Sequence, residues 1–352
     1  MFPHVSVIIL NWNGWKDTVE CLESLYQIDY PNYDVILVDN NSEDESLEKI
    51  RNYCSGSLRI ESKFFDYESG NKPIELVEYD ENQLKNQSNF SGTDFSTPNK
   101  KKLILIKNNE NYGFAKGNNI GINLALSVLD PDYIMLLNND TVVKENFLME
   151  LVNAAESNPE IGMAGSKILK YNNPQIIDST GHLLKMGRIV DRGHEEPDEG
   201  QYDDPEYIIG AIAAACLYKK EMLQGIGLFD ETFFTVYEDA ELSWRSHKNG
   251  WKTIYVPTSL VYHKRGKSIK KKSVNARMIM LQSENMLTTA KRYGTFKDKF
   301  QYSFIILADG GYYLKERLAG RNNINVSQLI IQVVKSYLSI IYDMVKGILK
   351  SG

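Results

Sequence analysis

Polar side chains follow several apolar runs of this sequence at the point where each run ends. Asn11 and Asn13 follow VSVIIL, Asp39 ends YDVILVD, and Asn138 to Asp140 follow YIMLL. A carboxylate can accept hydrogen bonds from a base or a ribose, and neutral amides can contact a nucleotide without repelling its phosphates. Asp39 taken alone is equally compatible with a helix cap or a turn. Taken together, these residues predict a polar rim that binds a nucleotide.

Such a rim also needs positive charge for the phosphates of its ligand. The sequence contains neither G-x-x-x-x-G-K-[ST] nor G-x-G-x-x-G, the glycine-rich loops that bind phosphates. A divalent metal ion, Mg²⁺ or Mn²⁺, is the expected substitute. Asp140 is a candidate ligand, because a single carboxylate can hold such an ion together with phosphate oxygens. His263 is a second candidate, although a lone histidine is more often structural.

Two adjacent acids, Glu238 and Asp239, lie near the start of the segment YEDAELSWR. Acids in a first helical turn complement the helix dipole, and Glu241 with Arg245 forms an ordinary i, i+4 pair, so a structural role would also explain them. The aromatic segment FDETFFTVY that precedes them would shield a carboxylate from water and raise its basicity. The sequence therefore offers a general base at this position.

Composition limits the class of protein that can carry this chemistry. The chain has 352 residues, 42% of them apolar, and a net charge of −6, which indicates a globular protein and argues against a nucleic-acid binder. Cys21, Cys54 and Cys216 form neither a C-x-x-C pair nor a zinc-type cluster. The N-terminus does not resemble a signal peptide, and no apolar stretch has the length of a membrane span. We expect a cytoplasmic protein, either free or at the inner face of the membrane.

Apolar runs of strand type alternate with segments of helical periodicity over most of the chain. Strands are expected at 5–10, 33–39, 103–106 and 132–140, with helices between them. This alternation predicts an α/β fold with a Rossmann-like, mostly parallel central sheet flanked by helices. Ligands of such sheets bind beyond the carboxyl ends of the strands. We expect residues 1–267 to form this domain.

Two segments fall outside the alternation. Residues from about 55 to 102 are polar, and their low hydrophobicity predicts a surface insertion with at most a small hairpin. Residues 268–352 predict a helical C-terminal appendage, whose last helix, from Val326 to Leu349, carries an apolar stripe. Three roles stay open for it: packing on the main domain, which is the default, homodimer formation, and peripheral membrane contact. A basic cluster from Lys264 to Lys272 would bind anionic lipid or an acceptor's phosphate, or face solvent.

Several longer motifs are similar, in order and spacing, to those of one enzyme family. They cover about 1–54 and 103–267, and they are VSVIILNWNG, VILVDNNS, NNENYGFAKGNN, YIMLLNNDTVV, GRIVDRGHEEPDEGQYD and GLFDETFFTVYEDAELSWRSHKNGWKTIYVPTSLVYH. The set resembles the inverting glycosyltransferases of family 2, which have the GT-A fold, and among them the rhamnosyltransferase-like branch. A single motif would be weak support, whereas the ordered set is specific.

The resemblance assigns roles to individual residues. It implies that Asp239 is the catalytic base and that Asn138 to Asp140 occupies the family's D-x-D position. Because Asn138 replaces the first acid, Asp140 would carry most of the metal binding, and His263 matches a further ligand of some relatives. The resemblance also implies residues that hold the nucleoside, namely Asn11, Asn13 and Asp39, and residues that line the nucleotide-sugar pocket, namely Asn111, Phe114 and Asn118.

The resemblance implies transfer of a sugar, with inversion, from a UDP- or dTDP-linked donor to a hydroxyl of a glycan or lipid-linked acceptor, in polysaccharide or cell-envelope biosynthesis. Two alternatives stay open: a non-catalytic nucleotide-sugar or glycan-binding protein, and a sugar-phosphate nucleotidylyltransferase. The latter should begin with a glycine-rich phosphate loop, which NWNGW does not provide. The loop that carries Arg188, Arg192 and His194 has two possible roles. It lies at the acceptor or phosphate side of the site, or it is a solvated surface loop.

Overall fold

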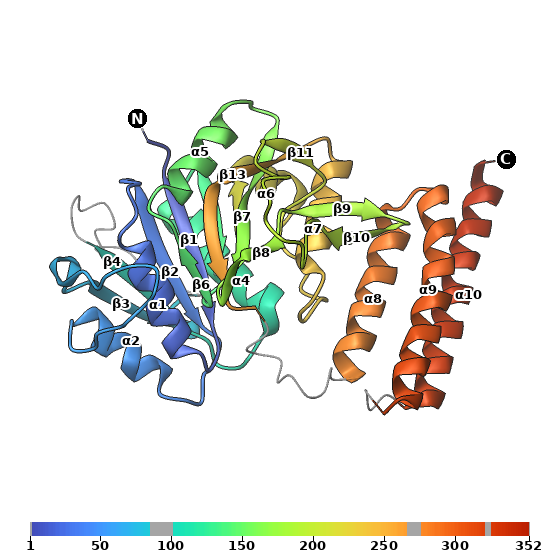
Figure 1. Cartoon of the computed structure of the whole chain (residues 1–352), viewed down its shortest axis with the longest axis horizontal. Coiled ribbons are helices and arrows are strands. Elements are labelled where there is room, and N and C mark those ends of the chain that lie inside the picture. Colours follow the sequence, from blue (N-terminus) through green and yellow to red (C-terminus); the bar gives the residue numbers. More distant parts are fainter. Residues whose placement is uncertain (1, 85–100, 266–275, 321–324, 352) are drawn as a thin grey trace.

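The computed structural model describes residues 2–84, 101–265, 276–320 and 325–351. Strands and helices are interspersed up to α5, the strands β7 to β12 follow one another, and after α6, α7 and β13 the chain ends in α8, α9 and α10 (Figure 1). The helices are α1 (Trp15–Leu25), α2 (Ser46–Cys54), α3 (Glu81–Leu84), α4 (Gly113–Leu124), α5 (Phe147–Glu156), α6 (Lys220–Ile226), α7 (Glu238–Lys248), α8 (Ala276–Tyr293), α9 (Phe296–Leu318) and α10 (Val326–Ser351). The strands are β1 (Val5–Asn11), β2 (Tyr33–Asp39), β3 (Glu75–Asp80), β4 (Lys102–Lys107), β5 (Tyr133–Leu137), β6 (Thr141–Val143), β7 (Ile161–Lys170), β8 (Asn173–Ser179), β9 (His182–Lys185), β10 (Arg188–Asp191), β11 (Glu206–Ile208), β12 (Ala215–Lys219) and β13 (Lys252–His263).

Eleven strands of the described residues form one sheet. Their order is β11, β13, β7, β12, β5, β1, β2, β4 and β3, with β6 beside β13 and β8 beside β7. β3, β4, β2, β1, β5, β7 and β13 all run in one direction, and antiparallel β12 lies between β5 and β7. β9 and β10 form a separate hairpin. The expected α/β fold with a mostly parallel central sheet is thus confirmed.

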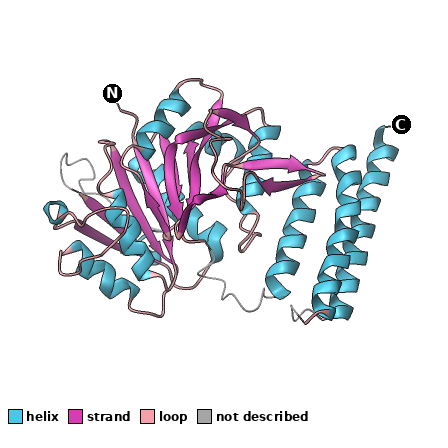
Figure 2. Cartoon of the chain, viewed as in Figure 1, coloured by secondary structure: helices cyan, strands magenta, loops and turns pink. Residues whose placement is uncertain are grey.

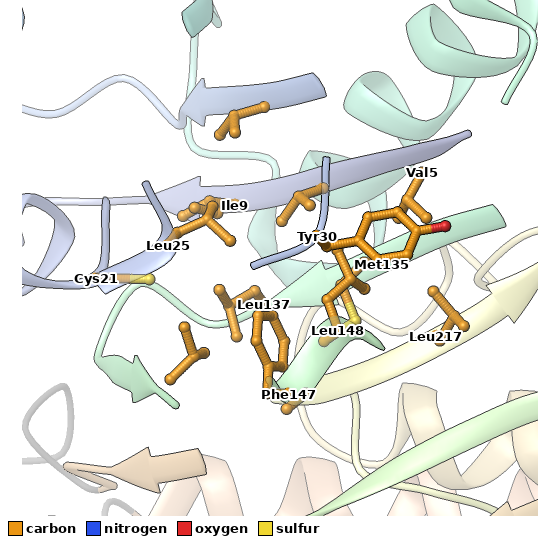
Figure 3. Packing of buried hydrophobic residues seen from close by; sticks show 14 of the residues in the cluster. Val5, Ile9, Cys21, Leu25, Tyr30, Met135, Leu137, Phe147, Leu148 and Leu217 are labelled. Atoms are coloured by element: carbon orange, nitrogen blue, oxygen red, sulfur yellow. The ribbon is translucent and has the colours of Figure 1, made fainter. Parts of the chain in front are cut away.

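The central strands β1, β2 and β5 are mostly apolar because helices cover both faces of the sheet. Along β1, Val5, Val7 and Ile9 pack on the side covered by α1, α2 and α5, whereas Ile8 packs on the side covered by α4 and α6. Successive strand residues point to opposite faces, so a strand covered on both sides is apolar at nearly every position. Figure 3 shows part of the first cluster, to which Phe147 of α5 belongs.

The common strand direction brings the polar residues that end the strands to one edge of the sheet. Asn11 and Asp39 are register partners at the ends of β1 and β2. Asn138 directly follows β5, and His263 is the last residue of β13. This edge is where ligands of open α/β sheets bind.

The polar insertion predicted at about 55–102 contributes more to the fold than its composition suggested. Its Glu75–Asp80 segment forms β3, which pairs in parallel with β4 at the edge of the sheet and does not form a hairpin. Ile74 and Tyr79 are buried there. The expectation of a surface insertion with at most a small hairpin is therefore wrong for residues 74–80. The edge of the sheet supplies both the hydrogen bonds and the apolar contacts that order them. Residues 85–100 lie outside the described residues.

A buried ion pair anchors the insertion to α1. Lys72 Nζ lies 2.9 Å from Glu23 Oε2, and the two side chains are 5% and 0% exposed. The Glu23 carboxylate also accepts hydrogen bonds from the Tyr53 hydroxyl (2.8 Å) and from the Glu68 backbone N–H (2.9 Å). Burial acts to raise the pKa of Glu23, but these donors together lower it. Glu23 is therefore ionised, and Lys72 balances its charge.

The C-terminal helices pack on the main domain. α8 contacts α7 and β10, and α9 and α10 contact each other and α8. In space, the end of the molecule on the far side of the β9–β10 hairpin consists of the described C-terminal helices (Figure 2). The shared core includes Trp244, Met286, Tyr302 and Ile340. No helix in the described ranges is long and apolar enough to span a bilayer. Of the predicted basic cluster, residues 266–272 lie outside these ranges.

Replacing Lys72 by Met should lower the free energy of unfolding by about 3 to 5 kcal/mol, because the buried Glu23 carboxylate then lacks its counter-charge. Arg51→Met is the matched control, since Arg51 pairs with Glu78 at 2.7 Å but its side chain is 46% exposed. Its cost should stay below about 1 kcal/mol. Urea unfolding measures both variants, and equal costs would contradict the anchoring role.

Candidate active site

A cleft of about 2380 Å³ opens at the carboxyl edge of the sheet. Typical small-ligand pockets occupy roughly 300 to 1,000 Å³, so this cleft has room for two substrates side by side. It is lined at one end by residues of the strand exits, namely Leu10, Trp12, Asn40, Asn111, Gly113, Phe114, Asn138, Asn139, Asp140 and His263. It is also lined by His182, Arg188, Asp191, His194, Ala213, Glu238 and Asp239, and by residues of α8 and α10.

Two predicted nucleoside ligands, Asn11 and Asp39, lie below the floor of the cleft. Both are buried, and the Asn11 amide donates to Asp39 Oδ1 at 2.7 Å. Asp39 also accepts two hydrogen bonds from Ser42, at 3.0 Å from the backbone and 2.6 Å from the hydroxyl. In the structure these side chains thus organise the loop after β2. Their predicted contact with a nucleoside stays a prediction.

Asn13 and Asn118 do not line the cleft. Asn13 is exposed, adopts φ 51°, and accepts hydrogen bonds from the backbone of Glu43 (2.7 Å) and Asp44 (3.2 Å). Contrary to the expectation, Asn118 does not line the pocket, because its position on α4 points it inward: it is buried and its amide donates to the Phe114 carbonyl at 2.9 Å. Asn111, Phe114 and Asn138 line the cleft, and their contact with a nucleotide sugar stays a prediction.

Asn40 organises this end of the cleft, and the sequence analysis missed it. Its amide donates to Asn111 Oδ1 at 2.8 Å and to the Gly113 carbonyl at 3.1 Å, while its carbonyl oxygen accepts from Asn108 at 3.0 Å. Its position directly after Asp39 in the polar run DNNS was the available signal. Asn40 therefore holds the 108–113 loop in place.

A close backbone contact joins this loop to the segment before Asp239. The Phe114 N–H donates to the Phe234 carbonyl at 2.7 Å. Gly113 adopts φ +76°, and a Cβ there would lie 2.2 Å from the Phe234 oxygen. Only glycine fits both conditions. The glycine of NYGFAK thus allows the start of α4 to contact the segment that precedes Asp239.

His263 is held between two carboxylates. Its Nε2 lies 3.1 Å from Asp140 Oδ1, and its Nδ1 lies 2.7 Å from Asp178 Oδ2. Burial acts to lower the pKa of His263, but the two carboxylates outweigh it and raise the pKa to about 9. Burial likewise acts to raise the pKa of Asp140, but His263 lowers it. Asp178, which the sequence analysis missed, fixes the orientation of the ring.

Asp140 and His263 fit the donor set of a divalent metal. A nitrogen and an oxygen that bind one ion at about 2.1 Å and at a right angle lie roughly 3 Å apart, close to the observed 3.1 Å. A histidine ligand whose second ring nitrogen contacts a carboxylate is the usual arrangement in metal sites, and Asp178 provides it. No cluster of three or more His, Cys, Asp or Glu that could bind an ion exists among the described residues, so substrate oxygens and water would complete the coordination.

Asp239 stands in the first turn of α7, where the helix dipole favours a carboxylate. Its Oδ2 accepts a hydrogen bond from the Ala213 backbone at 3.2 Å, and its Oδ1 accepts one from the Ala240 backbone at 2.7 Å. The side chain is 18% exposed and faces the cleft. These two N–H donors fix the carboxylate, and they leave an oxygen accessible to a ligand.

Buried His182 lies beside Asp239, and the sequence analysis did not select it. Its Nε2 is 3.9 Å from Asp239 Oδ2 and 3.8 Å from Asp191 Oδ1, while its Nδ1 is 3.2 Å from the Ser243 hydroxyl. Ser243 belongs to the same helix as Asp239. His182 therefore connects the β9–β10 hairpin to the first turns of α7.

The backbone before Asp239 is strained and is held by other elements. Val236 and Tyr237 adopt φ 72° and 77°, a region that a β-branched residue rarely enters. The Asn285 amide of α8 donates to the Val236 carbonyl at 2.7 Å. The Tyr237 hydroxyl accepts from the Ile189 N–H at 2.6 Å and donates to the Ile189 carbonyl at 3.1 Å. α8 and β10 thus position the carboxylate of Asp239.

Of the three basic residues predicted near the acceptor or phosphate, two line the cleft. Arg188 lines it and pairs with Asp309 at 2.9 Å, and His194 lines it and contacts the Asp178 carbonyl at 2.8 Å. Arg192 is buried and lies over the Tyr202 ring at 4.4 Å, so it is structural.

Glu238 is a buried acid without a hydrogen-bond partner for Oε2 among the described residues. It lines the cleft next to Asp239. Burial, and next the charge of Asp239, raises its pKa to about 8. Burial and the neighbouring Asp239 charge therefore favour the protonated, neutral form of its carboxyl group.

The Glu238 pKa predicts a stability change with pH. The folded protein keeps a proton that the unfolded chain releases above about pH 4.5, so this contribution to stability is complete below pH 4.5 and is lost as the pH rises through 8. Over this range the unfolding free energy of the wild type should fall by a few kcal/mol more than that of Glu238→Gln. Denaturant unfolding at several pH values measures the difference. Exposed Glu199→Gln is the control, and a pH dependence shared by all three proteins would contradict the assignment.

Residues 6–71 match the family described as glycosyl transferase family 2, and residues 95–278, more than half of the chain, match glycosyltransferase-like family 2. A poly-beta-1,6-N-acetyl-D-glucosamine synthase of Staphylococcus epidermidis is 22% identical over 262 residues, 73% of this chain and 49% of that protein. The chain thus spans about half the length of the curated relatives it matches.

Two solved structures share the fold. A mannosyltransferase of Pyrobaculum calidifontis, in complex with GDP-Man and Mn²⁺, has a TM-score of 0.51 at 14% identity and covers 99% of this chain and 87% of its own. GalNAc-T7 with UDP, GalNAc and Mn²⁺ has a TM-score of 0.57 at 16% identity and covers 96% and 58%. The rhamnosyltransferase-like branch stays a prediction. The matches over both parts of the sequence, together with the mostly parallel sheet, show that this chain belongs to glycosyltransferase family 2 and has the GT-A fold.

Proposed function

We propose that this protein transfers a sugar, with inversion, from a UDP- or dTDP-linked donor to a hydroxyl group of a glycan or lipid-linked acceptor. The observation that supports this is that Asp140 and Asp239, 99 positions apart in the numbering, line one cleft. Asp140 and His263 form a donor pair for a metal at one end, and Asp239 offers a carboxylate farther along. The cleft has room for donor and acceptor together.

The donor end of the cleft suits a nucleotide diphosphate sugar. Asn111 and Asn138 present neutral amides and Phe114 an aromatic ring, so the nucleotide meets little negative charge apart from Asp140. Mg²⁺ or Mn²⁺ bound by Asp140 and His263 would stabilise the charge that builds on the leaving diphosphate. The two similar structures, one with GDP-Man and Mn²⁺ and one with UDP, GalNAc and Mn²⁺, support a nucleotide-linked donor and a divalent metal without deciding the nucleoside.

The acceptor end of the cleft suits deprotonation of a hydroxyl group. Asp239 takes the proton of the acceptor hydroxyl as that oxygen attacks the anomeric carbon from the face opposite the diphosphate. The bond from the anomeric carbon to the diphosphate oxygen breaks in the same displacement, and the configuration inverts. The N–H groups of Ala213 and Ala240 hold the carboxylate in place for this step.

Asp239→Asn should bind the donor as the wild type does but transfer sugar about 10²- to 10⁴-fold more slowly, because the amide cannot accept the proton. A thermal-shift screen of UDP, dTDP, GDP and their sugars first identifies the donor, since ligands of the native state raise its melting temperature. Release of nucleoside diphosphate in the presence of acceptor then measures turnover. Exposed Asp29→Asn, outside the cleft lining, is the control.

Near-normal turnover of Asp239→Asn would reject Asp239 as the base. A wild-type protein that binds a nucleotide sugar but neither transfers nor hydrolyses it would favour the non-catalytic alternative instead.

Asp140→Asn should weaken the Mn²⁺-dependent part of donor binding at least about tenfold, because an amide oxygen is a poorer ligand for a divalent ion than a carboxylate. Calorimetric titration of the donor with Mn²⁺ and with EDTA measures this part directly. Glu284→Gln, which changes an exposed cleft carboxylate of α8 outside the proposed metal pair and its neighbours, is the control. Donor binding that is equally tight in EDTA would exclude the metal role.

A further inference from the structure

Most large apolar side chains that the described residues leave exposed lie on the two outermost helices, α9 and α10 (Figure 1). Thirteen of twenty are on these helices: Phe296, Phe300, Phe304, Leu307, Tyr312, Leu318, Ile330, Ile331, Val334, Leu338, Tyr342, Val345 and Leu349. Three more, Leu183, Leu184 and Met186, are on the neighbouring β9–β10 hairpin. The other four are scattered. Exposed apolar surface gathered in this way marks an interaction site.

The exposed residues form a stripe on each helix. On α10, Ile330, Val334, Leu338, Tyr342, Val345 and Leu349 follow one another at intervals of three or four residues, which places them on one face. The opposite face of α10 packs inward through Leu329 and Ile340. The apolar stripe predicted from the sequence is therefore divided: part of it packs, and a second apolar face remains uncovered.

The C-terminal region is also basic, unlike the rest of the chain. Residues 276–352 contain 11 of the 40 Lys and Arg but only 5 of the 46 Asp and Glu, so residues 1–275 carry 29 basic and 41 acidic side chains. Three acids of the helices are occupied within the protein: Asp309 pairs with Arg188, Asp343 pairs with Lys299, and Asp298 caps α9. Exposed lysines remain on both helices, namely Lys297, Lys315, Lys335 and Lys346.

We propose that the exposed faces of α9 and α10 bind the surface of an anionic lipid membrane. An amphipathic helix with apolar and aromatic side chains on one face and lysines beside them lies in the interface of such a bilayer. Anionic headgroups complement the excess of positive charge. A symmetric dimer through the same faces would bring like charges together. A head-to-tail dimer would find little apolar surface elsewhere on the described residues, because the remaining exposed apolar side chains are isolated.

This surface borders the cleft. Ile331 belongs to the exposed apolar residues of α10 and also lines the cleft, together with Lys335. If the proposed transfer reaction holds, membrane binding would bring an acceptor that is anchored in lipid to the open side of the cleft. The membrane contact itself does not depend on that activity, so it can be tested without it.

The full-length protein should sediment with vesicles of phosphatidylcholine that contain about one-third phosphatidylglycerol, and much less with phosphatidylcholine alone. The double variant Leu338→Ser, Tyr342→Ser should bind the anionic vesicles at least about tenfold more weakly, because two side chains lose their burial in lipid. The matched control is Phe2→Ser, Tyr207→Ser, which removes two similarly exposed side chains elsewhere. Circular dichroism and thermal unfolding check that both variants fold.

Three outcomes would overturn the proposal. They are the absence of vesicle binding by the wild type, equal binding of the two double variants, and equal binding to neutral and anionic vesicles. Sedimentation equilibrium without lipid gives a further test. If the wild type is a dimer and only the Leu338→Ser, Tyr342→Ser variant is a monomer, the surface binds a second copy of the chain instead. Failure of sugar transfer would leave all of these readouts unchanged.

Discussion

The common direction of the seven parallel strands is the constraint on which the site depends. Because β1, β2, β5 and β13 all end at one edge, residues that are more than a hundred positions apart meet there. A reversed β13 would move His263 to the opposite edge and separate it from Asp140. Burial on both faces favours apolar residues along these strands, and the polar residues that line the cleft follow their carboxyl ends. The same requirement thus produces both the core and the polar rim.

The C-terminal helices contribute to the geometry of the site as well as to the surface. Val236 and Tyr237 adopt backbone conformations that cost free energy, and such conformations persist only where surrounding contacts enforce them. Asn285 of α8 and Ile189 of β10 supply those contacts. The proposed base therefore depends on a helix that follows it by some forty residues. The sequence suggested a domain boundary at residue 267. In the structure, however, the helices that follow this boundary pack against the segment that carries Asp239.

Buried charges are concentrated beside the cleft and are paired in a chain. Asp140 contacts His263, His263 contacts Asp178, and Arg265 links Asp178 (3.2 Å) to Asp191 (2.7 Å). Each charge has a partner, which is what makes the burial of so many ionised groups tolerable. The network fixes the His263 ring, and Asp191 extends it to His182 and thereby toward Asp239. The network therefore joins the surroundings of Asp140 to those of Asp239 through side chains of which His182, Asp191 and Arg265 also line the cleft.

The sequence by itself determined the α/β class, the mostly parallel sheet and the position of its polar rim, because strand periodicity and the residues at strand ends are local properties. The ordered motifs also indicated the family. Tertiary structure decided which rim residues face the cleft. Asn40 lines it, Asp178 lies buried against His263, and Asn118 points inward from α4. It also decided that residues 74–80 join the sheet and that α10 leaves a second apolar face uncovered. Such outcomes depend on partners that are distant in the chain, and local periodicity carries no information about them.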